Sequence, residues 1–169
     1  MYPLGASPRT AKDRPALGAF QKQVAELQRA AIGTSRYVAE LNARISSIQR
    51  AFDVTPNAPA QLRKEAKAIE DRLEKIGIAL SGDQWLARQQ EPVGPGVLQR
   101  IQSAVINTTS DPGGTEREQF RIAGELFRQV HAQVKAVTDD LKKLEDVMEK
   151  AGAPWTPGRL PEWKAPPSN

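Results

Sequence analysis

The sequence contains no cysteine, which excludes disulfide bonds and thiolate metal sites. Aromatic residues are scarce, at 5% of the 169 residues. No apolar run approaches the roughly 20 residues that a helix needs to cross a bilayer, and the amino end lacks the apolar core of a signal peptide. No stretch alternates apolar and polar residues between turn signals, so strands are not expected. These absences favour an all-α domain without a membrane span.

Apolar residues do recur, at alternating spacings of three and four, along two long stretches of the chain. The first ladder comprises Leu17, Phe20, Val24, Leu27, Ala31, Thr34, Val38, Leu41, Ile45, Ile48 and Phe52, and the second comprises Phe120, Ala123, Phe127, Val130, Val134, Val137, Leu141, Leu144 and Met148. Such spacing keeps one narrow stripe on one side of a helix, the pattern with which helices pack against each other. The ladders therefore predict a helical bundle built on two long helices.

Helices are predicted over about residues 15–52, 58–81, 97–108 and 115–151, with a short helical turn at Trp85 and Leu86. Gly82 and Gly152 are placed to end helices in the left-handed conformation, and Thr115 with Glu118 matches a capping box. An elongated antiparallel four-helix bundle is favoured, because the connection after residue 81 is long enough to reverse the chain. The alternative is three rods, with the 97–108 helix stacked on the end of the 58–81 helix.

This organisation assigns residues 1–14 to a flexible lead-in, 15–152 to the helical bundle and 153–169 to an irregular tail that packs on the bundle. Prolines are too dense in the tail for a helix. Trp155, Arg159 and Trp163 are the candidates for binding a partner, since tryptophan and arginine are the residues most often found as interface anchors. Both tryptophans are nevertheless expected to fold back over apolar surface near the end of the last helix. The plainer interpretation, in which the tail covers the bundle's own core, is favoured over a partner site.

The residues that could carry chemistry are better explained by structure, and no catalytic, metal-binding or cofactor-binding residue is assigned. His131 is the only histidine, and the Glu-x-x-His motif of di-metal bundles fails because Arg128 stands where the acid is required. Asp139, Asp140, Glu145 and Asp146 are assigned to a charged outer face, where ion pairs between neighbouring turns are expected. The chain is therefore expected not to be an enzyme.

The tail resembles a known family. Its residues 151–161 (AGAPWTPGRLP) are similar to the closing signature of bacterial sortilin-like β-propeller proteins with BNR repeats, which are often labelled glycosyl hydrolases. Further pieces agree in order: Leu80-Ser81-Gly82-Asp83, Glu91-Pro92, Thr108-Thr109-Ser110 and Thr115-x-Arg117-Glu118. The resemblance implies a carboxy-terminal helical domain that follows a propeller in an extracytoplasmic protein. It carries no catalytic residue onto these positions.

The leading functional hypothesis is a non-catalytic interaction or scaffold module that docks on a β-propeller or another protein partner. The alternative is an accessory domain or fragment of a glycan-processing protein. A weaker alternative is a basic bundle that binds nucleic acid, because residues 1–52 carry eight basic side chains against three acidic ones. The leading hypothesis involves neither nucleic acid nor cofactor, and it leaves open a homo-oligomer in which a second copy completes the seam.

Overall fold

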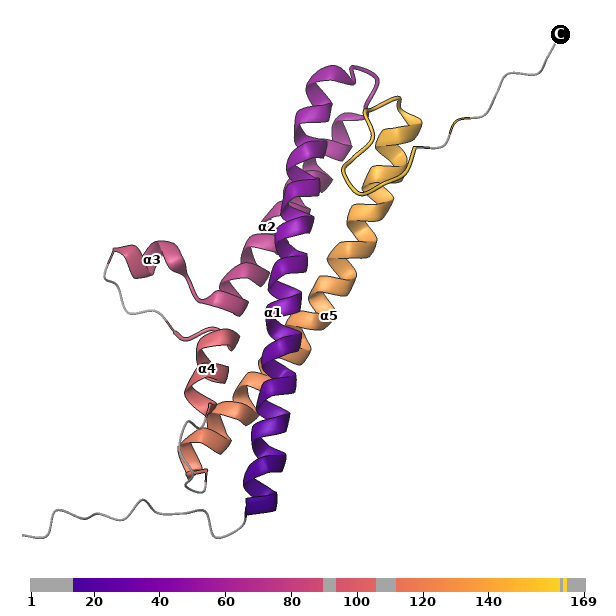
Figure 1. Cartoon of the computed structure of the whole chain (residues 1–169). Coiled ribbons are helices and arrows are strands. Elements are labelled where there is room, and N and C mark those ends of the chain that lie inside the picture. Colours follow the sequence, from indigo (N-terminus) through magenta and orange to yellow (C-terminus); the bar gives the residue numbers. More distant parts are fainter. Residues whose placement is uncertain (1–13, 90–93, 106–111, 162, 164–169) are drawn as a thin grey trace, which may run out of the picture. The chain divides into compact units, whose positions relative to one another are not determined.

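The structure, a computed structural model shown in Figure 1, describes residues 14–89, 94–105, 112–161 and 163. These residues contain five α-helices and one 3-10 helix, and no strand. The helices are α1 (Arg14–Ala51), η1 (Phe52–Val54), α2 (Ala60–Ser81), α3 (Gln84–Arg88), α4 (Val97–Ala104) and α5 (Gly114–Lys150). The all-α class is confirmed, and α1, α2 and α5 lie within about two residues of their predicted bounds. The predicted lead-in lies outside the described residues, except for residue 14.

The chain divides into two compact units that share the long helices. Unit 1 comprises residues 1–36 and 76–133, and unit 2 comprises residues 37–75 and 134–169. Unit 1 thus holds the first half of α1, the last turn of α2, α3, α4 and the first half of α5. Unit 2 holds the second halves of α1 and α5, most of α2, η1 and the tail. The assignment of residues 15–152 to a single bundle stays a prediction.

The interior of each unit is made by the predicted ladders. In unit 2 the buried ladder residues of α1 and α5 pack with an apolar stripe of α2; they are Val38, Leu41, Ile45, Ile48, Val134, Val137, Leu141, Leu144 and Met148, and the stripe of α2 is Leu62, Ala66, Ile69 and Leu73. In unit 1 the rings of Phe20 and Phe120 meet edge to face, with their centroids 5.4 Å apart. Four ladder positions, Leu27, Thr34, Phe120 and Phe127, are only partly buried. Periodicity therefore identified the seam along both long helices.

Within unit 2, α1 and α5 run in the same direction. Arg44 of α1 contacts Glu145 of α5. Further toward the carboxyl end of α1, Ser47 and Arg50 line the same hollow as Pro154 to Pro157, which follow α5. By contrast, α2 runs against α5, because Arg72 contacts Asp140 while the earlier Glu65 shares a groove with the later Val147. Four antiparallel helices would place the first and last helices in opposite directions, so the favoured arrangement is not confirmed.

Two glycines bring α4 to the end of α2 within unit 1. Gly82 ends α2 with φ +73°, the predicted left-handed conformation, and its amide donates to Ile78 O. A Cβ on Gly96, just before α4, would lie 2.5 Å from Gly82 N. The side-chain amide of Gln99 in α4 donates to Ser81 O. This end-to-end contact is the one that the three-rod alternative requires.

Two local predictions are wrong at helix ends. The capping box fails because α5 already begins at Gly114, so Thr115 lies inside the helix, and Glu118 pairs with Arg121 instead (2.7 Å). The predicted 97–108 helix ends at Ala104, since Val105 has extended backbone (ψ 122°). Residues 106–108 lie outside the described part of the chain. The capping box and the length of this short helix were therefore predicted less well than the long helices.

Replacing a seam residue should destabilise the protein far more than replacing its neighbour. Leu141 is fully buried and Lys142 is exposed. Leu141→Ala is expected to lower the free energy of unfolding by about 2–5 kcal/mol, because it removes buried apolar contacts and leaves a cavity. Lys142→Ala should change it little. Urea unfolding followed by circular dichroism measures both, and equal small effects would contradict the assigned seam.

Candidate functional site

Glu145 is a carboxylate in the middle of an apolar seam. Its side chain is 0% exposed, although it lies on α5 between the core residues Leu144 and Met148. The expectation that it lies on a charged outer face is wrong. Residues spaced three and four apart share a helix face, and Glu145 follows Leu141 by four positions, which places it on the edge of the buried stripe. An ionised carboxylate there requires charged partners.

Two arginines and a threonine supply those partners. Arg44 of α1 binds the carboxylate bidentately, with Nε 2.8 Å from Oε1 and Nη2 2.6 Å from Oε2. Arg159 of the tail donates from Nη1 to Oε2 (3.1 Å), and the hydroxyl of Thr156 donates to Oε1 (3.1 Å). Bidentate arginine–carboxylate pairs are among the strongest hydrogen-bonded pairs in proteins. We call Arg44, Glu145, Thr156 and Arg159 the Glu145 clasp.

The clasp keeps Glu145 ionised. Burial by itself raises the pKa of this carboxyl, but the hydrogen bonds from Arg44 and Arg159 outweigh it and hold the pKa below the ordinary 4.5. Glu149, one turn further along α5, behaves oppositely, because burial raises its pKa despite the attraction of Arg159. Its Oε2 accepts a bond from Arg159 Nη2 (2.9 Å), and its buried Oε1 forms an ion pair with Arg159 Nε (2.7 Å). The surroundings thus lower the pKa of Glu145 and raise that of Glu149.

The clasp holds the beginning of the tail against the end of α5. The helix ends at Gly152 (φ +84°), where the amides of Gly152 and Ala153 donate to Glu149 O and Met148 O. These are the two bonds of a Schellman motif. After a turn with Gly158 at φ +87°, Arg159 returns to α5 and also contacts Asp146 Oδ1 (2.6 Å). In Figure 1 the yellow segment after α5 accordingly loops back beside the end of that helix.

The anchored tail presents Trp155 to solvent beside the end of α1. Trp155 is 41% exposed, and Val54 of η1 is 66% exposed. A hollow of about 300 Å³ separates the two segments of unit 2. Its lining residues are Ser47, Arg50, Ala51, Val54, Pro154, Trp155, Thr156 and Pro157, and we call it the tail hollow. An exposed tryptophan on a fixed backbone is the feature by which interface anchors are recognised.

The three predicted partner-binding residues have different surroundings. Trp155 lines the tail hollow. Trp163 is 81% exposed, so the expectation that it covers apolar surface is wrong. Among the tail residues that the structure describes, Ala153 and Thr156 are the buried ones. The side chain of Arg159 is only 21% exposed and is engaged by Glu145, Asp146 and Glu149. The role of all three in binding a partner stays a prediction.

Of the four clasp residues, only Arg159 was singled out from the sequence as a candidate for the site, and Arg44, Glu145 and Thr156 were missed. The ladder of α5 contained a signal for Glu145, because Leu141, Leu144 and Met148 surround it at helical spacing. No local pattern marks Arg44, which lies 101 residues before its partner. Of the other acids assigned to the outer face, Asp140 pairs with Arg72 of α2 across 2.6 Å. His131 is exposed, with its ring 5.9 Å from that of Phe127.

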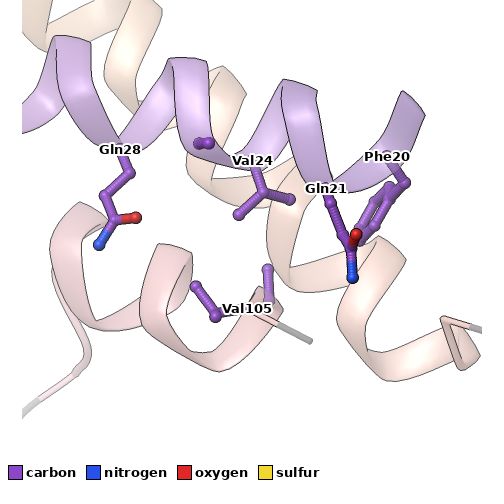
Figure 2. Close-up of a pocket in the computed structure, with 7 residues that line it drawn as sticks. Phe20, Gln21, Val24, Gln28 and Val105 are labelled. Atoms are coloured by element: carbon purple, nitrogen blue, oxygen red, sulfur yellow. The ribbon is translucent and has the colours of Figure 1, made fainter. Parts of the chain in front are cut away.

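Other hollows lie in the described part of the chain. One of about 310 Å³ between α2 and α5 in unit 2 is lined by the charged residues Glu65, Arg72, Asp140 and Lys143, and its arginine and lysine both pair with Asp140. The one in Figure 2, about 180 Å³ in unit 1, has Val24 and Val105 on opposite sides and Gln21 and Gln28 at its flanks. All of its lining residues are uncharged. Across the described residues, no group of three or more acids or histidines is placed to hold a metal ion. In the same residues no helix is long and apolar enough to span a membrane.

Comparison with known proteins identifies no relative: no protein-family model matches the chain, and searches of curated sequences and of solved structures also found no match. The interpretation of the site therefore depends on the contacts described above.

Removing the buried carboxylate should destabilise the protein strongly. Glu145→Ala leaves Arg44 and Arg159 facing each other without the charge that holds them, and is expected to cost about 3–5 kcal/mol. Glu118→Ala is the matched control, since Glu118 also pairs with an arginine but is exposed, and it should change stability little. Urea unfolding at neutral pH compares the two. Equal effects would contradict the clasp.

The pH dependence of stability should differ between Glu145 and Glu149. Because the folded pKa of Glu145 is lowered, its stabilisation is present above 4.5 and is lost as pH falls through the folded pKa. The deficit of Glu145→Gln relative to wild type should therefore shrink in acid. Glu149 has a raised pKa, so its charge disfavours the folded state at neutral pH. Glu149→Gln should then be at least as stable as wild type at pH 7. Chemical unfolding of the three proteins across pH tests both predictions. A stability deficit of Glu145→Gln that grows in acid would contradict the prediction for Glu145, and a Glu149→Gln variant less stable than wild type at pH 7 would contradict the prediction for Glu149.

Proposed function

We propose that this chain is a non-catalytic helical interaction module that binds a protein partner at the tail hollow. The observation that carries the proposal is the combination of the clasp with an exposed Trp155. The apolar ladders already provide both units with a core, and a buried ion pair adds little stability beyond what apolar residues of similar size would provide. The structural consequence of the clasp is the fixed position of residues 153–159.

A fixed tail favours binding for an entropic reason. Ordering a mobile segment on association opposes binding, and a segment that is already ordered avoids that loss. The Schellman motif at Gly152 and the contacts of Arg159 order the tail before any partner arrives. Trp155 then offers a large side chain with few rotatable bonds. These features support Trp155 as the anchor of an interface.

The resemblance of residues 151–161 to the closing segment of sortilin-like propeller proteins supports a β-propeller as the partner and an extracytoplasmic setting. These residues include Thr156 and Arg159 of the clasp and the tail side of the hollow, from Pro154 to Pro157. For the fold, the parallel direction of α1 and α5 in unit 2 and the α2–α4 contact in unit 1 support the three-rod arrangement over four antiparallel helices.

The proposal predicts a partner whose retention depends on the tail tryptophans. Wild-type protein immobilised on resin is exposed to extract from the native source, and bound proteins are quantified by mass spectrometry. Trp155→Ala with Trp163→Ala should deplete a specific bound protein at least about tenfold, as expected for loss of an interface anchor. Trp85→Ala is the matched control, because Trp85 is 65% exposed but lies on α3 in unit 1.

A bound set that is the same for all three proteins would overturn the proposed site. Loss of the same protein from both the Trp85→Ala and the tail variants would indicate adhesion through exposed tryptophan in general, and would also count against it. Circular dichroism of each variant checks that the helices remain intact.

A further inference from the structure

The tail hollow has one charged residue in an otherwise apolar and neutral lining. Ala51, Val54, Pro154, Trp155 and Pro157 provide its apolar surface, and Arg50 is the only lining residue with a charge. Arg50 is exposed near the end of α1. The volume of the tail hollow, about 300 Å³, is at the lower end of the roughly 300–1,000 Å³ that is typical of ligand pockets. That size suits one large side chain and its neighbours rather than a whole cofactor.

The hydroxyl groups of the lining already have partners. The Ser47 hydroxyl donates to Ala43 O at 3.0 Å, and the Thr156 hydroxyl donates to Glu145 Oε1 at 3.1 Å. Pro154 and Pro157 have no backbone N–H to donate. Arg50 donates from Nη2 to Ser47 Oγ (3.2 Å), which leaves most of its five N–H groups available. Apart from the indole N–H of Trp155, the free donors of the lining side chains are therefore those of the Arg50 guanidinium.

Neighbouring arginines do not share this availability. Arg44 and Arg159 are held by Glu145, and Arg159 also by Asp146 and Glu149. Among the described residues, no acid lies within ion-pair distance of Arg50. Its charge is thus the uncompensated one at the hollow, and an incoming carboxylate would complement it.

We infer that the tail hollow binds an extended peptide segment of the partner that presents a large apolar side chain next to a carboxylate. The apolar side chain packs against Trp155 and Val54, and the carboxylate pairs with Arg50. The prolines leave few backbone donors for strand-like pairing, so recognition is through side chains. This inference rests on the proposed function and specifies the chemistry of the partner at the same site.

Tryptophan fluorescence can test the inference with defined peptides. The sequence has three tryptophans, and Trp85→Phe with Trp163→Phe leaves Trp155 as the only one that reports. The probes are short synthetic peptides with a central leucine flanked by glutamate, by glutamine or by lysine. The glutamate peptide should produce a saturable shift of the Trp155 emission. Its dissociation constant should be at least about tenfold lower than that of the glutamine peptide, as expected for a hydrogen-bonded charge. The lysine peptide should produce no saturable shift.

Variants of the same reporter protein assign the charge. Arg50→Gln should abolish the preference for glutamate over glutamine, and Arg50→Lys should retain part of it. Lys150→Gln is the matched control, because Lys150 is another exposed cation near this end of the unit but does not line the hollow; it should leave the preference unchanged. Replacing the central leucine by glycine should abolish binding of the glutamate peptide.

The outcomes separate the inference from the proposed function. Equal binding of glutamate and glutamine peptides, or a preference that survives Arg50→Gln, would overturn the recognition of a carboxylate. The absence of any saturable shift would overturn the peptide site at the hollow. If tail-dependent capture of a protein still occurs in either case, the proposed function stands while the inference fails. If capture is independent of the tail tryptophans, the proposed function fails.

Discussion

The ion pair between Arg44 and Glu145 is the interaction on which the carboxy-terminal part of the molecule depends. Glu145 is fully buried, and its carboxylate accepts hydrogen bonds from α1 and from the tail at once. A buried charge without such partners would be neutral or would unfold the site. The same contacts that make the charge tolerable also determine where the tail lies. The position of Trp155 is therefore linked to the ionisation of one carboxylate.

This linkage explains why the tail buries small and polar residues while its tryptophan stays exposed. Its residues 153–161 bury only Ala153 and Thr156, while Trp155 and Leu160 are 41% and 88% exposed. Apolar burial alone would favour the reverse, with the tryptophan inside. Polar contacts hold this segment instead, through Arg159 and the Schellman motif at Gly152. Under the proposed function, the exposed Trp155 is the side chain that contacts the partner.

Periodicity predicted the helices because their cause is local. Alternating three- and four-residue spacing made the seams of α1 and α5 visible, and the glycines at 82 and 152 marked helix ends because both adopt positive φ. The clasp could not be predicted in the same way. Arg44 and Glu145 are 101 residues apart, and nothing near either residue in the sequence distinguishes it from a charged side chain on an outer helix face. The parallel direction of α1 and α5 in unit 2 could not be predicted either, because an apolar ladder identifies the buried face of a helix but not the direction of the helix that packs on it.

Amide hydrogen exchange at Arg159 tests the central claim most directly. Its amide donates to Thr156 O at 3.3 Å within the turn that the clasp holds. Two variants are compared under conditions in which both remain folded. Glu145→Ala removes the central carboxylate of the clasp, and Leu141→Ala weakens the packing of the same helix without changing a clasp residue. Glu145→Ala should accelerate exchange at Arg159 relative to the α5 amides, and Leu141→Ala should not. Equal acceleration in both variants, or none with Glu145→Ala, would contradict the account.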